Sequence, residues 1–318
     1  MYRVLHLDPY GYSETAKNRI RSVALLDEGP MDRKTLVSEI HKYHGVILRF
    51  GNKIDSEIIS HAKNLRVIAT NTTGTDHIDT TAAASANVSV ISLKGEYKFL
   101  STISSTAELT WGLILCLLRN IPASITDVHR GLWRRDSFVG RDLTGRRLGI
   151  LGFGRIGKMV SRYGQAFDME VKFYDSDVEG GAEGIERLSS IEQLFSWSDI
   201  LTIHLPLNEV TQGIVSGSLI ERLRPTSYLI NTSRGAILNE EDLFHCLTTK
   251  KIAGAALDVL SGELDKDFPF NSKLVNYSKN NSNLLISPHI GGASYDAWQK
   301  TEDFICEKVA LFFESLKL

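Results

Sequence analysis

The sequence of 318 residues has no excess of charge of either sign and no long apolar run. It holds 36 lysines and arginines against 38 aspartates and glutamates, and no basic stripe indicates a nucleic-acid-binding protein. The longest apolar run, around residues 111–118, is too short to cross a bilayer. We therefore expect neither a nucleic-acid nor a membrane partner.

Cysteines are also few. Cys116, Cys246 and Cys306 are isolated and show no paired spacing. This usage is typical of small buried thiols in a reducing compartment, and it favours neither a disulfide framework nor a metal site. The first residues read as a strand from the start, so we expect no signal peptide. The sequence therefore predicts a cytoplasmic protein without a bound metal.

Short apolar runs alternate with helix-like segments along the chain, which is typical of parallel sheets covered on both faces. The length suits two domains. In the first third, predicted strands lie at 3–7, 45–49, 66–70 and 88–91, and predicted helices lie at 31–42, 56–62 and 80–86. No glycine-rich loop follows any of these strands. We therefore do not expect this part to hold a dinucleotide.

A long predicted helix at 102–120 leads into a second series of strands and helices. Its predicted strands are 148–151, 170–174, 200–204, 228–231, 253–257 and 284–287. An amphipathic helix at 294–316 ends the chain, and it would make the first domain discontinuous if it packs back on that domain. The polar segment 263–283 reads as a loop.

The second series begins with a strand, a glycine turn and a helix start in the order that a dinucleotide site requires. Gly152 permits the tight turn, Gly154 lets the backbone approach a pyrophosphate, and Gly157 allows close packing of helix on strand. The free amides and partial positive charge of the helix N-terminus favour phosphate there. The pattern predicts a dinucleotide site.

An acidic residue, Asp175, ends the next strand about 20 residues past the glycines, where a carboxylate hydrogen-bonds the adenosine ribose. It would repel a 2′-phosphate, and Ser176 follows it rather than an arginine. The predicted cofactor is therefore NAD(H) and not NADP(H). Read by itself, Asp175 could be a turn residue at a strand end.

Three segments near the C-terminus carry Arg234, Glu263 and His289. They follow predicted strands at 227–230, 252–257 and 283–286. Because ligands bind beyond the carboxyl ends of parallel strands, we expect these side chains at one crevice. Reduction of a 2-oxo acid needs a charged fork for its carboxylate, a proton donor for its oxygen and a carboxylate that orients that donor. The sequence predicts Arg234, His289 and Glu263 in these roles, respectively.

Each of the three residues has a simpler interpretation. Arg234 could be a helix-capping or surface arginine, Glu263 a solvated acid in a loop, and His289 a satisfied buried histidine. The catalytic interpretation depends on all three lying at or just past strand ends of the sheet that carries the glycine turn. Asp258 also ends a strand, and we interpret it as facing the nicotinamide amide.

These residues resemble the D-isomer-specific 2-hydroxyacid dehydrogenase family. The matching segments run along nearly the whole chain: 71–79, 105–109, 131–133, 152–157, 204–206, 231–235, 256–259 and 287–292. The resemblance implies an α/β fold with two doubly wound parallel-sheet domains. A flavodoxin-like substrate domain (1–100 plus 288–318) would contain an inserted Rossmann-type NAD domain (101–287). It also implies a homodimer joined largely through the cofactor domains.

The resemblance assigns further ligand contacts. It implies that the cofactor is bound by Arg155, Ile156, Leu205, Pro206, Thr232, Ser233, Asp258, Gly291 and Gly292. Arg155 and Ile156 would lie at the pyrophosphate. The backbone of Thr73 and Gly74 would meet the substrate carboxylate.

Two departures from the family pattern stand out. The proline that commonly follows the catalytic glutamate is delayed to Pro269, although Glu263 keeps the usual offset from Asp258. The loop 95–104 is longer than the common form. Lys98 in that loop and Arg49 at the end of its strand are candidate anion partners, although Lys98 could equally be a surface lysine.

The sequence thus predicts an NAD-dependent enzyme that interconverts a D-2-hydroxy acid and its 2-oxo acid, with phosphoglycerate-like or sugar-derived acids among the candidates. One alternative is a dehydrogenase of another small anion. Glu263 disfavours formate, because formate dehydrogenases of this fold pair the histidine with glutamine, but it does not exclude phosphite. The other alternative is a corepressor-like scaffold that senses NAD(H).

Overall fold

The computed structural model describes residues 1–178, 180–181, 184–265 and 267–316. The chain forms two compact units. Unit 1 comprises Met1–Ile103 and Ala293–Leu318, and unit 2 comprises Ser104–Gly292. The resemblance places the two boundaries at residues 101 and 288, a few residues before the observed ones. Unit 1 is discontinuous, because the last helix of the chain returns to it.

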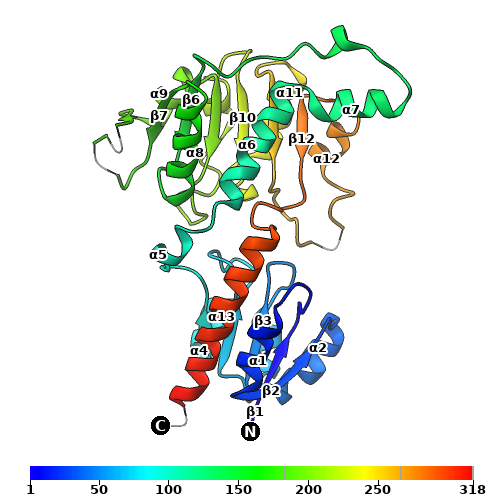
Figure 1. The fold of residues 1–318 in the computed structure, drawn as a ribbon, viewed down its shortest axis with the longest axis vertical. Coiled ribbons are helices and arrows are strands. Elements are labelled where there is room, and N and C mark those ends of the chain that lie inside the picture. Colours follow the sequence, from blue (N-terminus) through cyan, green and yellow to red (C-terminus); the bar gives the residue numbers. More distant parts are fainter. Residues whose placement is uncertain (179, 182–183, 266, 317–318) are drawn as a thin grey trace. The chain divides into compact units, whose positions relative to one another are not determined.

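Unit 1 is built on a five-stranded sheet in which all strands run parallel, in the order β2-β1-β3-β4-β5 (Figure 1). Its strands are β1 (Tyr2–His6), β2 (Ala24–Glu28), β3 (Gly45–Leu48), β4 (Val67–Thr70) and β5 (Ser89–Ile91). This is the flavodoxin-like order, and its direction reverses between β1 and β3.

Helices cover both faces of this sheet. They are α1 (Glu14–Arg21), α2 (Arg33–Glu39), η1 (Ile40–Lys42), α3 (Ser56–His61), α4 (Thr80–Ser85), α5 (Tyr97–Leu100) and α13 (Tyr295–Ser315). One core joins α1 and α13 to the sheet through residues such as Ile20, Ile305 and Phe313. A second core, on the other face, includes Leu36 and Ile58.

Strand β2 was not among the predicted strands. Its sequence, ALLDE, directly follows α1, and its burial alternates poorly from residue to residue. It lies at the edge of the sheet and pairs only with β1 among the described strands. An edge strand needs no continuous apolar run, so the hydrophobic pattern of these residues did not indicate a strand.

Unit 2 is built on a seven-stranded parallel sheet in the order β12-β11-β10-β9-β6-β7-β8. Its strands are β6 (Arg147–Leu151), β7 (Glu170–Tyr174), β8 (Glu186–Arg187), β9 (Ile200–Ile203), β10 (Tyr228–Asn231), β11 (Gly254–Leu257) and β12 (Leu284–Ile286). The order reverses between β6 and β9, as in a dinucleotide-binding fold. The two sheets confirm the predicted fold class.

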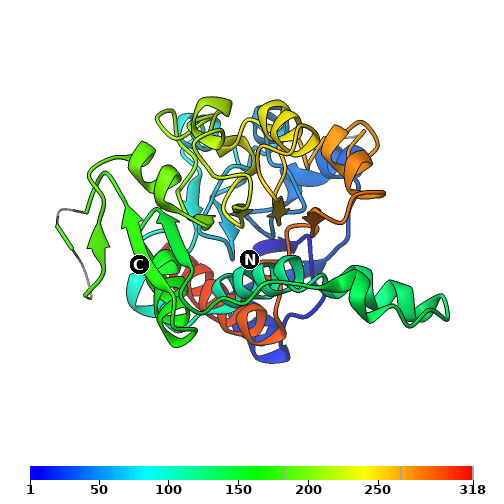
Figure 2. The same ribbon diagram turned by 90° about the horizontal axis from the view of Figure 1, so that it is seen from above.

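Helices of unit 2 lie on both faces of its sheet, which Figure 2 shows from above, and one of them projects away from it. They are α6 (Ser105–Leu118), α7 (Ile121–His129), η2 (Arg135–Phe138), α8 (Arg155–Ala166), α9 (Ile191–Trp197), α10 (Gly217–Ile220), η3 (Gly235–Ile237), α11 (Glu240–Thr248) and α12 (Lys273–Ser278). Helices α6 and α8 pack together on one face, and α9–α12 lie on the other.

Helix α12 corrects the prediction that 263–283 is all loop. Ser272 caps this helix by accepting a hydrogen bond from the backbone N–H of Val275, 3.3 Å away. Leu274 anchors it in the core. One cap and one buried leucine in a polar segment are too few to produce a helical pattern that can be recognised in the sequence.

One stretch of the described chain, Tyr97–Leu118, is long and apolar enough for a membrane-spanning helix by length and composition, a test that core helices also pass. In the structure this stretch is divided into α5 and α6. Helix α6 buries Trp111, Ile114 and Leu117 in the core of unit 2. That packing accounts for its apolar composition.

Candidate active site

The glycine turn lies between β6 and α8, at the point where the strand order of unit 2 reverses. Gly152 has φ +94°, and a Cβ there would lie 2.8 Å from the carbonyl of His204. A Cβ at Gly157 would lie 2.2 Å from the Gly152 oxygen. Around Gly154, in contrast, no described atom lies within 4 Å of the Cβ position. The first and last glycines are therefore required by packing, whereas the middle one leaves open space.

Gly154 is also the N-cap of α8, and as a glycine it has no side chain with which to cap this helix. Backbone N–H groups and a partial positive charge at a helix N-terminus favour an anion there. Arg155 is the first helical residue, Ile156 follows it half-buried, and burial lowers the pKa of the Arg155 guanidinium. A phosphate at this terminus would offset that loss of solvation.

Asp175 lies at the end of β7, beside the glycine turn. Its carboxylate accepts hydrogen bonds from the backbone N–H of Phe153 at 2.7 Å and of Asp177 at 2.9 Å. The first contact ties the glycine turn to β7. A carboxylate has about four lone-pair positions, so these two bonds leave capacity for ribose hydroxyls.

The segment after β9 lies against the same turn. The side chain of Leu205 lies 3.1 Å from the Cβ position of Gly152. Pro206 is exposed, and its carbonyl accepts a hydrogen bond of 2.6 Å from Thr211. The hydroxyl of Thr232, after β10, lies 2.8 Å from that of Thr110 in α6.

Arg234 is presented by a turn that Asn231 organises at the end of β10. The Asn231 side-chain oxygen accepts from both the N–H and the hydroxyl of Ser233, at 3.0 and 2.7 Å. Its amide donates to the carbonyl of Arg234 at 2.9 Å. The half-buried guanidinium donates to the Ser233 carbonyl at 2.7 Å. The backbone that carries Arg234 is thus fixed by one buried asparagine.

Glu263 and His289 are in direct contact. The Oε1 atom of Glu263 lies 2.8 Å from Nδ1 of His289, and the two side chains are 17% and 24% exposed. This contact orients the imidazole and selects which nitrogen carries a proton toward a ligand. The His289 backbone has φ +53°, a left-handed conformation that is unusual outside glycine and is found at functional sites.

Asp258 fixes the turn that carries His289. It is 1% exposed, and its carboxylate accepts from the Ser287 hydroxyl at 2.5 Å and from the N–H groups of Ile290 and Gly291 at 2.9 and 2.7 Å. Burial raises the pKa of Asp258, while these donors favour its carboxylate. Its contact with the nicotinamide stays a prediction.

The two glycines after the histidine differ in their surroundings. The carbonyl of Gly291 accepts a hydrogen bond of 3.1 Å from Thr106 in α6. Around Gly292 no described atom lies within 4 Å of the Cβ position. Side-chain atoms of Asp258 and Thr106 thus lie close to the Cβ position of Gly291, whereas that of Gly292 is open space.

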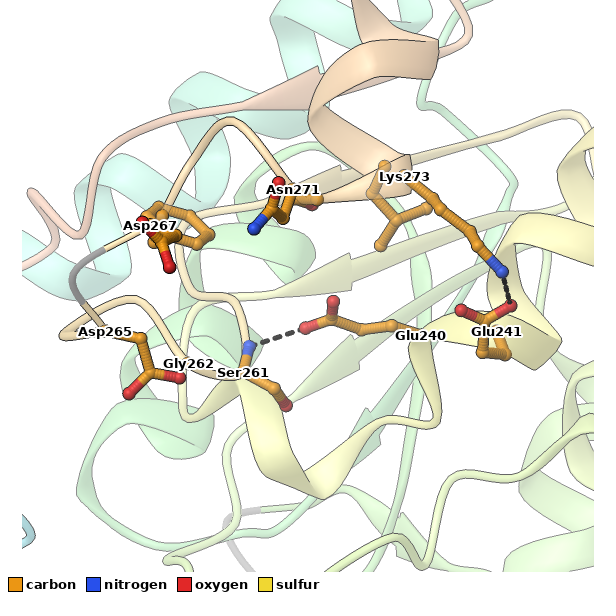
Figure 3. A pocket seen from close by; sticks show the side chains of 11 residues that line it. Glu240, Glu241, Ser261, Gly262, Asp265, Asp267, Asn271 and Lys273 are labelled. Atoms are coloured by element: carbon orange, nitrogen blue, oxygen red, sulfur yellow. Dashed lines mark hydrogen bonds and ion pairs between the residues drawn. The ribbon is translucent and has the colours of Figure 1, made fainter.

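Two residues that sequence reasoning missed hold the loop of Glu263. A Cβ at Gly235 would lie 2.1 Å from the Leu260 carbonyl carbon, so the turn of Arg234 and the loop of Glu263 touch backbone to backbone. Glu240, at the start of α11, accepts a hydrogen bond of 2.5 Å from the Ser261 N–H (Figure 3). An acidic residue in a first helical turn is common, so the sequence did not mark Glu240.

A cavity of about 420 Å³ is lined by this loop and by the first residues of α11 and α12 (Figure 3). Its charged lining comprises Glu240, Glu241, Asp265, Asp267 and Lys273. The lysine is paired with Glu241 at 2.7 Å. Within the described residues these acids form no group able to hold a metal ion. A negative lining repels a pyrophosphate or a carboxylate, so we do not assign the cofactor or the substrate to this cavity.

The predicted substrate residues of unit 1 follow β3 and β4. Thr73 is exposed, and the carbonyl of Gly74 accepts a hydrogen bond of 2.6 Å from the Thr72 hydroxyl. Arg49 is 15% exposed and bonds Glu302 of α13 and the Tyr10 carbonyl. The sequence did not predict that Arg49 has a protein carboxylate as its partner.

The reversed strand order, the glycine turn and the histidine–carboxylate pair together define an α/β protein with a dinucleotide-binding unit. Residues 111–291 match the model of the D-isomer specific 2-hydroxyacid dehydrogenase NAD binding domain. The chain belongs to the D-isomer specific 2-hydroxyacid dehydrogenase family. The resemblance seen in the sequence is thereby confirmed, and the matched part of unit 2 is the family's NAD-binding domain.

Two similar proteins with known names are dehydrogenases. The D-3-phosphoglycerate dehydrogenase of Sus scrofa is 32% identical over 276 residues, which cover 86% of this chain and 49% of that protein. The enzyme of the same name from Archaeoglobus fulgidus is 33% identical over 281 residues, covering 88% and 51%. The chain thus spans about half the length of these relatives. The TT0316 protein of Thermus thermophilus superposes with a TM-score of 0.85 at 28% identity, covering 98% and 97% of the two chains.

Proposed function

We propose that this protein is an NAD(H)-dependent oxidoreductase that interconverts a D-2-hydroxy acid and its 2-oxo acid. The main support is the 2.8 Å contact between Glu263 and His289, which follow two strands of the sheet that carries the glycine turn. Membership of the 2-hydroxyacid dehydrogenase family supports the same reaction. Among the named relatives, two are D-3-phosphoglycerate dehydrogenases.

Each catalytic residue has one task in this proposal. The chemistry that NADH would supply when bound is a hydride for the carbonyl carbon. His289 donates a proton from Nε2 to the carbonyl oxygen, because its Nδ1 atom is held by Glu263. Arg234 holds the substrate carboxylate, since a planar guanidinium can contact two oxygens at once. In the reverse direction, His289 accepts the proton from the hydroxyl group.

The preference for NAD(H) over NADP(H) is carried by Asp175. Its carboxylate is fixed by the N–H groups of Phe153 and Asp177. A negative charge held at this place would accept hydrogen bonds from ribose hydroxyls and repel a 2′-phosphate. The adjoining α8 terminus would hold the pyrophosphate.

A screen of NADH oxidation with 2-oxo acids of increasing size tests the reaction. We expect turnover with at least one of them and a much slower reaction with NADPH. Phosphite and formate, each supplied with NAD, form a second arm of the screen. Reduction of NAD with phosphite and no reaction with any 2-oxo acid would favour the dehydrogenase of another small anion.

We also propose a homodimer. Figures 1 and 2 show α7 and the segment after it extending away from the sheet of unit 2. This projecting segment exposes apolar side chains: Ile125 (49%), Val128 (49%), Trp133 (86%) and Val139 (79%). Exposed apolar clusters are typical of protein interfaces. Light scattering should give twice the chain mass, and Trp133→Ser should shift the mass toward that of one chain.

The proposed compartment is the cytoplasm. Cys246 and Cys306 are buried free thiols, and Cys116 is a half-buried one. Thiols kept unpaired in this way are typical of a reducing compartment. Fractionation of the cells that produce the protein, followed by immunodetection, would place it.

A further inference from the structure

An arginine and a glutamate form a buried ion pair at the carboxyl edge of the sheet in unit 1. Arg49 directly follows β3, one of the two strands between which the order of this sheet reverses. Glu302 lies on α13 and is 0% exposed, whereas Arg49 is 15% exposed. In parallel sheets, ligands bind at this edge, so the state of Arg49 bears on what unit 1 can recognise.

The surrounding residues hold Arg49 in place. Its backbone N–H donates to Asp8 at 2.9 Å, and its Nη2 atom donates to Glu302 and to the Tyr10 carbonyl. The guanidinium carbon lies 4.2 Å from the ring centroid of Trp298. Glu302 lies four residues after Trp298 on α13, so one face of this helix supplies both contacts.

The pairing changes the charge that this edge offers. An unpaired arginine would attract a phosphate or a second carboxylate of a ligand. Here Glu302 supplies the countercharge: burial raises its pKa to about 7, while the contact with Arg49 favours the carboxylate. Removal of one partner of a buried ion pair is strongly unfavourable. A ligand anion would have to compete with a carboxylate that is already in contact with the guanidinium.

We propose that Glu302 is a specificity-determining residue. Glu302 pairs with the guanidinium of Arg49 at the carboxyl edge of the sheet in unit 1, so this positive charge is not offered to a ligand. The enzyme therefore favours 2-oxo acids without a second anionic group. Phosphorylated and dicarboxylic substrates are disfavoured. This inference rests on the proposed reaction and on the predicted substrate role of Arg49. By this inference, the preferred substrate of this chain differs from 3-phosphoglycerate, which the relatives' names give.

Two substrates that differ only in a phosphate group provide the test. Hydroxypyruvate and 3-phosphohydroxypyruvate have the same carbon skeleton and the same reacting carbonyl. With the wild-type protein, kcat/KM should be at least about tenfold higher for hydroxypyruvate. With Glu302→Gln, the ratio should move toward the phosphorylated substrate by roughly tenfold, mainly through a lower KM for that substrate.

Glu307→Gln is the matched control. It makes the same substitution on the same helix, at an exposed residue whose partner is Arg19. This variant should keep the wild-type ratio. The thermal transition of both variants shows whether unit 1 remains folded, and the wild-type ratio tests the inference even if Glu302→Gln does not fold.

The outcomes separate the two proposals. If no 2-oxo acid is reduced, the proposed reaction itself fails. If the wild-type protein reduces both substrates but prefers the phosphorylated one, the reaction stands and the inference about Glu302 is overturned. A folded Glu302→Gln protein with an unchanged ratio would also overturn it, because Glu302 would then not govern the preference.

Discussion

The two sheets of this protein share a parallel, doubly wound layout, yet their reversal points carry different chemistry. In unit 2, β6 ends in the glycine turn, and the chain after β9 lies against it. In unit 1, the chain after β1 places Asp8 against the backbone of Arg49, which follows β3. Gly154 is exposed at the first point, whereas the side chains of Asp8 and Arg49 lie at the second. The same architecture therefore provides a dinucleotide site in one unit and a side-chain surface in the other.

The helix that follows the first strand of each sheet shows why. The N-terminus of α1 is capped by Ser13, which accepts from the Ala16 N–H at 3.0 Å and donates to Asp303 at 2.6 Å. The N-cap of α8 is Gly154, which has no side chain with which to cap the helix. A capped terminus has fewer free amides for a phosphate. The role of a residue in one unit can thus be tested by a substitution there and a matched control substitution in the other unit.

The largest expected effect is the loss of the proton donor in unit 2. His289→Ala should lower kcat by roughly 10²–10⁴-fold, because no group replaces the general acid. NADH binding, measured by fluorescence titration, should stay close to the wild-type value. His41→Ala, which removes an exposed imidazole from unit 1, is the control and should leave kcat unchanged. Equal losses in the two variants would contradict the role of His289.

The next effect concerns the packing of the glycine turn. Gly157→Ala places a Cβ 2.2 Å from the Gly152 oxygen, so the start of α8 must move. Overpacking costs about 1–3 kcal/mol, and NADH affinity should fall roughly 10- to 100-fold if that strain appears in binding. Gly112→Ala, in α6, is the control, because no described atom lies within 4 Å of its Cβ position. Unchanged NADH affinity in Gly157→Ala would argue against cofactor binding at this turn.

A smaller effect is expected from Glu240, which acts on catalysis through the loop of Glu263. Glu240→Ala removes the acceptor of the Ser261 N–H, a hydrogen bond of the kind worth about 1.5–3 kcal/mol, and kcat should fall roughly tenfold. The pH profile of kcat should shift, because Glu263 holds His289 less firmly. The KM for NADH should not change.

Two further variants separate this role from general stability. Glu240→Gln keeps an acceptor oxygen and should restore most of the rate. Glu14→Ala removes the corresponding first-turn acid of α1 in unit 1 and should leave kcat and its pH profile unchanged. If the pH profile of kcat is unchanged in Glu240→Ala, then Glu240 does not position Glu263.

Much of unit 2 could be predicted from the sequence, because its signals are local. The glycine turn lies within six residues, and Asp175 lies at the end of the next strand. Arg234, Glu263 and His289 follow strands β10, β11 and β12, which are neighbours in the sheet. Strand ends on one edge bring such residues together without knowledge of side-chain packing, and the contact between Glu263 and His289 follows from that topology.

Contacts that depend on packing could not be predicted. Arg49 and Glu302 lie 253 positions apart, and they meet only because α13 returns to unit 1. Glu240 and Ser261 lie 21 positions apart, in a helix and a loop with no shared motif. Strand β2 and helix α12 lacked periodic patterns, because each buries only one or two side chains deeply. Sequence periodicity reports on individual elements and does not report which elements meet.

The smallest effect concerns acid stability, and it compares one histidine in each unit. Burial lowers the pKa of His6, at the end of β1, and of His204, after β9, to about 3. The unfolded chain protonates these groups near pH 6.5. Their contribution to stability is therefore complete above pH 6.5 and is lost as the pH falls toward 3, at up to about 1.4 kcal/mol per pH unit for each group. His6→Gln and His204→Gln should each reduce the slope of the unfolding free energy between pH 6.5 and 5, measured by urea titration. A slope unchanged in one variant would mean that this histidine is protonated in the folded protein, and the two reversal points would then differ in solvation as well as in chemistry.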